Sequence, residues 1–164
     1  MDFSLSLCFL VILPLVFVPN SHGSFHASCK IQWNWKLNCS TVNELIITQI
    51  KTWNGPEGCA HGGEKCLYFL KESSPTVIKA IHETPTKHYK DDLTFNFAKS
   101  PEGGCSVGGY STSETWYAVL DDGTNYCNLH NLITGSKLDK AAGYVETTND
   151  SQCTQYSSRN CDKY

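Results

Sequence analysis

The amino-acid sequence predicts a mostly β protein with one helix, in which an antiparallel meander of strands closes into a barrel. Two observations favour this class. From Glu64 onward, short segments rich in Val, Ile, Phe and Tyr follow one another, separated by Gly, Pro, Asp and Ser. One stretch, over residues 42–53, instead repeats its apolar residues at helical spacing. Because this helix precedes most of the strands, the alternative is an α+β arrangement with one helix packed on a curved antiparallel sheet.

The first two elements are a strand and the helix. Over residues 30–37, apolar and polar residues alternate, so one face of the strand is apolar. The sequence Thr41-Val42-Asn43-Glu44 fits a capping box, in which the Thr41 and Glu44 side chains satisfy free amides of a first helical turn. Gly55-Pro56 ends the helix that follows.

The later part of the chain predicts strand after strand. The clearest alternation is at 93–97, where Leu93, Phe95 and Phe97 share a face. Asp121-Asp122-Gly123 predicts a hairpin turn, because Asp-Gly tolerates the positive backbone angles of tight turns. The predicted strands are 66–70, 76–83, 93–97, 105–111, 115–120, 124–133 and 143–148.

Residues 1–23 are predicted to be a secretory signal peptide. The apolar run LSLCFLVILPLVFV at 5–18 is too short to cross a bilayer comfortably, and small residues suit cleavage after Gly23. No second apolar run approaches membrane length. We therefore expect residues 24–164 to be a single secreted, extracellular domain of 141 residues without stable membrane insertion.

The chain has nine cysteines, of which Cys8 lies in the signal peptide. Eight remain, and in an oxidising compartment this even number predicts four disulfides. Short separation along the chain favours two pairs, Cys59 with Cys66 and Cys153 with Cys161. The partners of the other four stay open at this point: Cys29, Cys39, Cys105 and Cys127.

In a secreted protein, two sequons, at Asn38 and Asn149, are candidate N-glycosylation sites. Each lies beside a cysteine near a predicted element boundary. Asn149 is the better candidate, because its surroundings, ETTNDSQ, are typical of a polar loop.

One segment resembles a known family. Residues 115–127, TWYAVLDDGTNYC, are similar to the lipocalin (calycin) signature, in which an aromatic-rich strand leads into an Asp-bearing turn and Asn-Tyr begins the next strand. Lys65-Cys66-Leu67-Tyr68 is similar to an early strand of cysteine-rich lipocalins. The resemblance covers about a quarter of the chain and implies a lipocalin-like barrel.

The chain also departs from the lipocalin pattern. No glycine precedes Trp33 or Trp35 as in the usual Gly-x-Trp, and Arg159, the one candidate for the closing arginine, follows the last predicted strand. A helix followed by a curved sheet resembles the cystatin-like arrangement instead. No Gln-x-Val-x-Gly loop or Pro-Trp hairpin accompanies it, so cystatin-type protease inhibition has no support from the residues.

Motifs for enzymatic chemistry are not found, so we expect no catalytic residues and no cofactor. The sequence contains no nucleophile elbow and no His-Glu-x-x-His. Cys59, His61 and Cys66 could imitate a zinc site, but in a secreted protein a disulfide-closed loop is the better interpretation, so no metal site is expected. A net charge of −3 argues against nucleic-acid binding.

The sequence therefore favours recognition. Our first hypothesis is a secreted, non-enzymatic binding protein for a small, largely apolar ligand. The alternative is an inhibitor or extracellular effector that contacts another extracellular protein through loops such as 54–64. Aromatic residues on predicted strands could either fill a core or line a ligand cavity: Trp33, Trp35, Phe95, Phe97, Trp116 and Tyr117.

Overall fold

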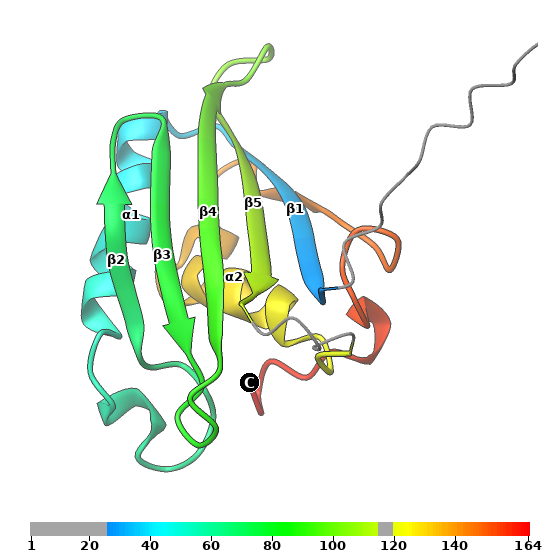
Figure 1. Cartoon of the computed structure of the whole chain (residues 1–164). Coiled ribbons are helices and arrows are strands. Elements are labelled where there is room, and N and C mark those ends of the chain that lie inside the picture. Colours follow the sequence, from blue (N-terminus) through cyan, green and yellow to red (C-terminus); the bar gives the residue numbers. More distant parts are fainter. Residues whose placement is uncertain (1–25, 115–119) are drawn as a thin grey trace, which may run out of the picture.

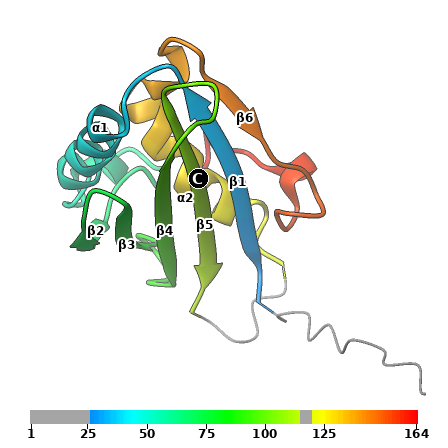
Figure 2. The same cartoon turned by 90° about the horizontal axis from the view of Figure 1, so that it is seen from above.

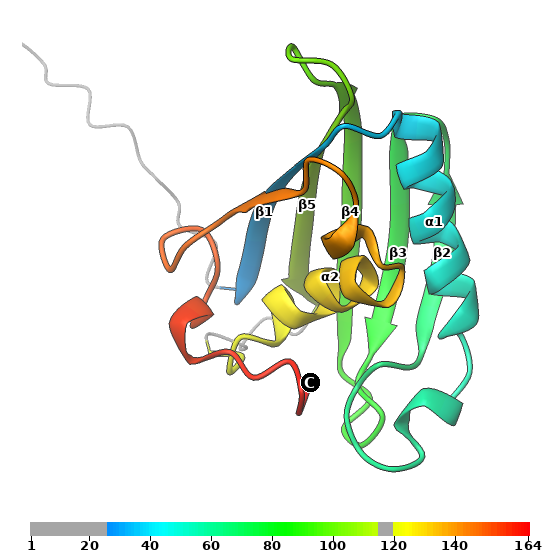
Figure 3. The same cartoon turned by 180° about the vertical axis from the view of Figure 1, so that it is seen from behind.

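Six strands form one antiparallel sheet, and two α-helices cover one of its faces (Figures 1 and 3). This is a computed structural model that describes residues 26–114 and 120–164, so the predicted signal peptide lies outside the described residues. The elements are β1 (Ser28–Trp35), α1 (Cys39–Thr52), η1 (Glu57–Cys59), β2 (Tyr68–Ser73), β3 (Val77–Glu83), β4 (Lys90–Lys99), β5 (Cys105–Ser113), α2 (Thr124–Gly135), η2 (Leu138–Lys140), β6 (Val145–Thr147) and η3 (Tyr156–Ser158).

The sheet is open within the part of the chain that the structure describes. Its strand order is β2-β3-β4-β5-β1-β6, so β2 and β6 are the two edges. Figure 2 shows β6 beside β1 at one edge, with α1 near the other. The mostly β, antiparallel character is confirmed, but the sheet does not close into a barrel. The arrangement is nearer to the alternative prediction of a helix packed on an antiparallel sheet, with a second helix added.

The first strand and helix confirm the sequence prediction. Along β1, every second side chain is buried beneath the helices, which is what the two-residue alternation requires. Helix α1 begins earlier than predicted, because its N-cap is Asn38, whose Oδ1 accepts a hydrogen bond from the Thr41 amide at 2.9 Å. The predicted helix start at Thr41 is therefore wrong, because the helix begins about one turn earlier.

The segment after the Asp-Gly turn is a helix, so the prediction of a strand over 124–133 is wrong. The Asp121 carboxylate accepts hydrogen bonds from the amides of Gly123, at 3.2 Å, and Asn125, at 2.9 Å. Gly123 is the N-cap residue and has φ +78°, a left-handed conformation that glycine adopts without strain. The Asp-Gly pair thus starts a helix rather than the return strand of a hairpin. Residues 115–119 of the predicted strand 115–120 lie outside the described residues.

A single core lies between the sheet and the two helices. Trp33 from β1 is fully buried, and its ring stacks on Phe95 of β4, with 6.1 Å between centroids. Gly109 on the neighbouring β5 makes room for this indole, because a Cβ there would lie 2.4 Å from Trp33 Cζ3. The glycine therefore permits the large ring at the centre of the sheet.

Four disulfides cross-link the described chain, and such a set is typical of extracellular proteins. The predicted pair Cys59–Cys66 is confirmed. The predicted pair Cys153–Cys161 is wrong, because Cys153 bonds to Cys29 on β1 and Cys161 bonds to Cys127 on α2. The fold brings partners together that are 124 and 34 residues apart, so closeness in sequence is a poor guide. The fourth pair is Cys39–Cys105.

Candidate functional site

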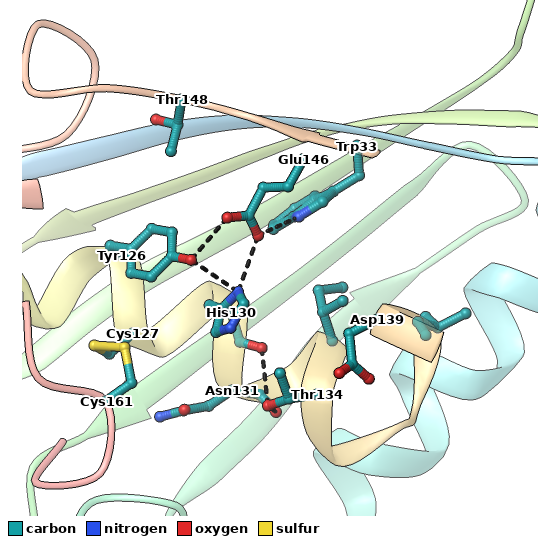
Figure 4. A network of polar contacts seen from close by, with 12 residues as sticks. Trp33, Tyr126, Cys127, His130, Asn131, Thr134, Asp139, Glu146, Thr148 and Cys161 are labelled. Atoms are coloured by element: carbon teal, nitrogen blue, oxygen red, sulfur yellow. Dashed lines mark hydrogen bonds and ion pairs between the residues drawn. A yellow bond between two sulfur atoms is a disulfide. The ribbon is translucent and has the colours of Figure 1, made fainter. Parts of the chain in front are cut away.

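A dense polar cluster is centred on Glu146 of β6, which accepts hydrogen bonds from side chains of β1 and α2 (Figure 4). Tyr126 Oη donates to Oε1 at 2.7 Å, and Trp33 Nε1 donates to Oε2 at 2.9 Å. His130 Nδ1 lies 2.9 Å from Oε2, and Tyr144 Oη donates to the same oxygen at 3.0 Å. One carboxylate therefore joins β1, α2, β6 and the segment before β6.

The hydrogen-bond geometry assigns the proton on His130. Tyr126 has a single phenolic proton, which it gives to Glu146. The 2.9 Å contacts of His130 Nδ1 with Glu146 Oε2 and Tyr126 Oη then require a proton on Nδ1.

The electrostatics of this cluster indicate that Glu146 holds the surrounding segments together and does not exchange protons near neutral pH. Burial by itself would raise the pKa of Glu146, but the hydrogen bonds from His130, Trp33 and Tyr126 outweigh it and hold the pKa at about 2. Burial, together with the neighbouring Glu146 carboxylate, raises the pKa of the Tyr126 and Tyr144 phenols. Near neutral pH Glu146 is thus a fixed anion held by several hydrogen-bond donors.

A second feature is a groove of about 330 Å³ at one end of the sheet. Its walls come from the loop before β2, the β3–β4 loop, the start of α2 and the C-terminal residues. In Figures 1 and 3 the C-terminus lies near the end of the sheet where β3 and β4 are joined. The lining residues are Glu64, Thr84, Thr86, Lys87, Tyr89, Asp91, Ser113, Leu120, Asp121, Asp122, Thr124, Lys163 and Tyr164.

Three carboxyl groups in this groove are poorly solvated. Burial raises the pKa of Glu64, and the negative charge of Asp91 raises it further. Burial also raises the pKa of Asp91 and of Asp121, although hydrogen bonds from Ser113 and Asn128 to Asp91 oppose the change. Oε2 of Glu64 is buried and has no hydrogen-bond partner among the described residues. The groove therefore contains an acidic group, Glu64, whose hydrogen-bonding capacity is incompletely used.

A buried histidine positions the Glu64 loop. His82 on β3 is fully buried, its ring lies against Tyr68 with 4.4 Å between centroids, and its Nε2 lies 2.8 Å from the main-chain oxygen of Glu64. A carbonyl oxygen accepts, so Nε2 carries the proton. Burial lowers the pKa of His82 to about 4, and the imidazole is neutral under ordinary conditions. We assign His82 to holding the loop, not to proton exchange with solvent.

The aromatic residues selected from the sequence lie elsewhere. Trp33, Trp35, Phe95 and Phe97 belong to the packed core, where none is more than 6% exposed. The structure thus favours the core interpretation of these four over cavity lining, and none of them lines the groove. Trp116 and Tyr117 lie outside the described residues.

Sequence reasoning did not identify the residues of the Glu146 cluster or the role of the groove carboxylates. The sequence predicted Asp121 only as part of a hairpin turn. One usable signal was the spacing of Asn125, Asn128 and Asn131, which places three amides on adjoining turns of a helix. All three are buried in α2.

Two classes of site are not found in the described part of the chain. Within residues 26–114 and 120–164, no group of three or more His, Cys, Asp or Glu side chains is arranged to hold a metal ion. None of the helices there is long and apolar enough to span a membrane. Among known proteins, no family model and no curated sequence matches this chain, so the resemblance to lipocalins stays a prediction.

Proposed function

We propose that the protein is a secreted, non-enzymatic binding protein and that the groove beside Glu64, Tyr89 and Asp121 holds a small ligand. The observation that carries this proposal is the groove itself, a concave site of about 330 Å³ with partly desolvated polar groups. Four disulfides and the packed aromatic core support a rigid scaffold around it.

The lining indicates the kind of ligand. Tyr89 and Leu120 are 42% and 71% exposed, so they offer apolar surface that a ligand can cover. Carboxylates and the ammonium groups of Lys87 and Lys163 lie in the same groove. A ligand with a largely apolar body and one polar group would use both kinds of surface.

Glu146 and His82 have structural rather than catalytic roles in this proposal. A general base near neutral pH needs an accessible group whose pKa lies near the operating pH. Glu146 is held as an anion by its donors, with a pKa of about 2, and His82 is buried with its Nε2 hydrogen used by Glu64. These groups therefore act as fixed parts of the scaffold.

Amide chemical shifts would test the groove directly. We would titrate the mature protein with 2-phenylethanol, 2-phenylethylamine and 3-phenylpropionate, which share an aryl group and differ in charge. We expect at least one of them to shift the amides of Tyr89, Leu120 and Thr124, and Tyr89→Ala to weaken that binding. Tyr110→Ala, on the opposite face of the sheet, is the matched control.

Two results would contradict the proposed site. One is a set of shifts confined to core residues such as Trp33 and Phe95, which would place the ligand inside the fold. The other is the absence of any shift at millimolar concentration of all three compounds.

We also propose that the secreted protein is glycosylated. Asn38 and Asn149 are both exposed, and each sequon serine donates its hydroxyl to the Oδ1 of its asparagine, at 2.8 Å for Ser40 and 2.6 Å for Ser151. Asn38 also caps α1, and it does so through Oδ1 rather than through the amide nitrogen that would carry a glycan.

A second candidate function is binding of an extracellular protein through the loop at 54–64. This loop contains η1, is largely exposed, and is closed by the Cys59–Cys66 disulfide, so it presents a shaped surface. A pull-down from extracellular fluid would test it by comparing the wild-type chain with a Glu57→Ala, His61→Ala variant. A partner retained equally by both chains would exclude this loop.

A further inference from the structure

The C-terminal strap, residues 155–164, lies along one side of α2. Gln155 Oε1 accepts hydrogen bonds from the amides of Asp121 and Asp122, both at 2.8 Å. Arg159 packs against Gly123 so closely that a Cβ at this glycine would lie 2.7 Å from Arg159 Cβ. The strap therefore starts at the N-terminal end of α2, where the groove also begins.

Further along, the strap meets α2 at two more points. Cys161 is bonded to Cys127, and the main-chain oxygen of Tyr164 accepts a hydrogen bond from Asn131 Nδ2 at 2.9 Å. Gly123, Cys127 and Asn131 are four residues apart, so they lie on one face of the helix. This face is buried beneath the strap, since Cys127 and Asn131 are 0% and 2% exposed.

The disulfide links the last five residues covalently to α2, and the Cys161 and Tyr164 side chains also pack against the core. Apart from these, the described contacts of 160–164 with the rest of the chain include the Asn131 hydrogen bond and a 3.3 Å contact between Tyr164 Oη and Asp122. Several other hydrogen bonds stay within the strap, such as those from the Lys163 and Tyr164 amides to the Asn160 oxygen. The strap also supplies Lys163 and Tyr164 to the groove wall, so its position sets the shape of the groove.

We propose that the Cys127–Cys161 disulfide is a redox latch: an external dithiol reduces it, the strap leaves α2, and the groove opens on that side. A thiolate of the dithiol attacks Sγ of Cys161, which is the more exposed partner, and the S–S bond to Cys127 breaks. The second thiolate of the reagent then attacks the mixed disulfide and releases Cys161. The reagent is oxidised to its own disulfide, and its two protons end on the Cys127 and Cys161 thiols.

The rest of the fold does not depend on the latch. Helix α2 remains packed on the sheet through Leu129, Leu132 and Ile133, all of which are fully buried. The start of the strap is still held by Gln155. Opening is therefore local, which is the behaviour expected of a segment with few buried contacts of its own.

Hydrogen exchange on matched cysteine variants tests this proposal. In Cys127→Ala, Cys161→Ser we expect the amides of Lys163 and Tyr164 to exchange at least about tenfold faster than in the wild type, while the amide of Leu93 on β4 keeps its protection. The control variant Cys59→Ser, Cys66→Ala should leave the strap amides unchanged. Tyr164→Phe keeps the ring and removes only the hydroxyl, with its contacts to Asp122 and Lys163, and should also change them little.

A second measurement uses the wild-type chain in case the cysteine variant does not fold. Graded dithiothreitol, followed by alkylation and mass spectrometry, should give a species labelled at Cys127 and Cys161 in which Leu93 remains protected. The proposal is overturned if strap exchange is unchanged once this disulfide is open, if Leu93 loses protection together with the strap, or if Tyr164→Phe alone frees it.

Discussion

Replacement of Glu146 by Gln would test the claim that one buried anion joins β1, α2 and β6. The carboxylate accepts hydrogen bonds from Trp33, Tyr126, His130 and Tyr144. An amide of the same shape keeps one accepting oxygen but turns an N–H group toward donors on the other side. At least one buried donor then loses its partner, and the charge that strengthened every bond is removed.

The size of the effect follows from the pKa of Glu146. A lowering from 4.5 to about 2 corresponds to a little more than 3 kcal/mol of preferential stabilisation of the anion in the folded state. Because the group is partly exposed and screened by solvent, we expect about 2 kcal/mol from this source. Since the folded-state pKa is the lower one, this stability is complete well above pH 4.5 and is lost as the pH falls towards 2.

Urea unfolding with the disulfides intact would measure this effect. We expect Glu146→Gln to lose about 2–3 kcal/mol of unfolding free energy near pH 7, and the difference from the wild type to shrink strongly at about pH 3. Glu102→Gln, on the exposed β4–β5 loop, is the matched control and should be neutral at both pH values. Equal stability of Glu146→Gln and wild type near pH 7, or a difference that does not change with pH, would refute the argument.

Three further outcomes are expected. Gly123→Ala should lower the unfolding free energy by about 2 kcal/mol in the same urea assay, because alanine is strained at φ +78° and its Cβ would meet Arg159; a neutral result would show that the strap does not pack there. Removal of the Cys29–Cys153 disulfide by paired substitution with Ala should cost roughly 4–5 kcal/mol by the loop-entropy estimate for a separation of 124 residues, measured by thermal unfolding, and an unchanged melting temperature would contradict it. Asn149→Gln should remove one N-glycosidase-sensitive mass increment from protein secreted by eukaryotic cells, and identical masses before and after the enzyme in the wild type would disprove glycosylation.

The strands and the first helix were predictable because their signals are local. In β1 each apolar residue faces the helices, and the two-residue period is visible in the sequence itself. Helix α1 buries Val42, Ile46 and Ile50, which are four residues apart. Only its start was misjudged, since Asn38 and Thr41 are both good N-cap residues and the choice depends on which backbone turn forms first.

Helix α2 was missed because its buried surface mixes three asparagines with the apolar residues. Asn125, Asn128 and Asn131 are at most 2% exposed, so a search for apolar periodicity does not find this face. Their amides are satisfied by partners that are distant in the chain, such as Asp91 for Asn128 and the Tyr164 oxygen for Asn131. Hydrogen bonds to distant parts of the chain therefore stabilise a helix here, although the preceding Asp-Gly pair is typical of a β-hairpin.

The Glu146 cluster was beyond local inference for the same reason. Its members come from positions 33, 126, 130, 144 and 146, and only pairing of β6 with β1 brings the first and last together. Glu146 is opposite Trp33 in the register of these two strands. A shift of one residue would turn Glu146 to the other face, so the cluster is a consequence of strand register rather than of any motif.

The cross-links of the last third of the chain help to fix the side of the groove that lies opposite Asp91 of β4 and Ser113 of β5. Beyond α2, the only strand among the described residues is β6, and the chain there is held mainly by Cys29–Cys153, Cys127–Cys161 and the Glu146 cluster. Lys163 and Tyr164 of this region form one wall of the groove, and loops such as the one between β3 and β4 form the others. Substitutions at exposed wall positions such as Tyr89 and Leu120 should therefore alter what the groove binds while leaving the unfolding free energy within about 0.5 kcal/mol of the wild type. A large loss of stability at either position would mean that the groove wall is part of the core, and the argument for a separable binding surface would fail.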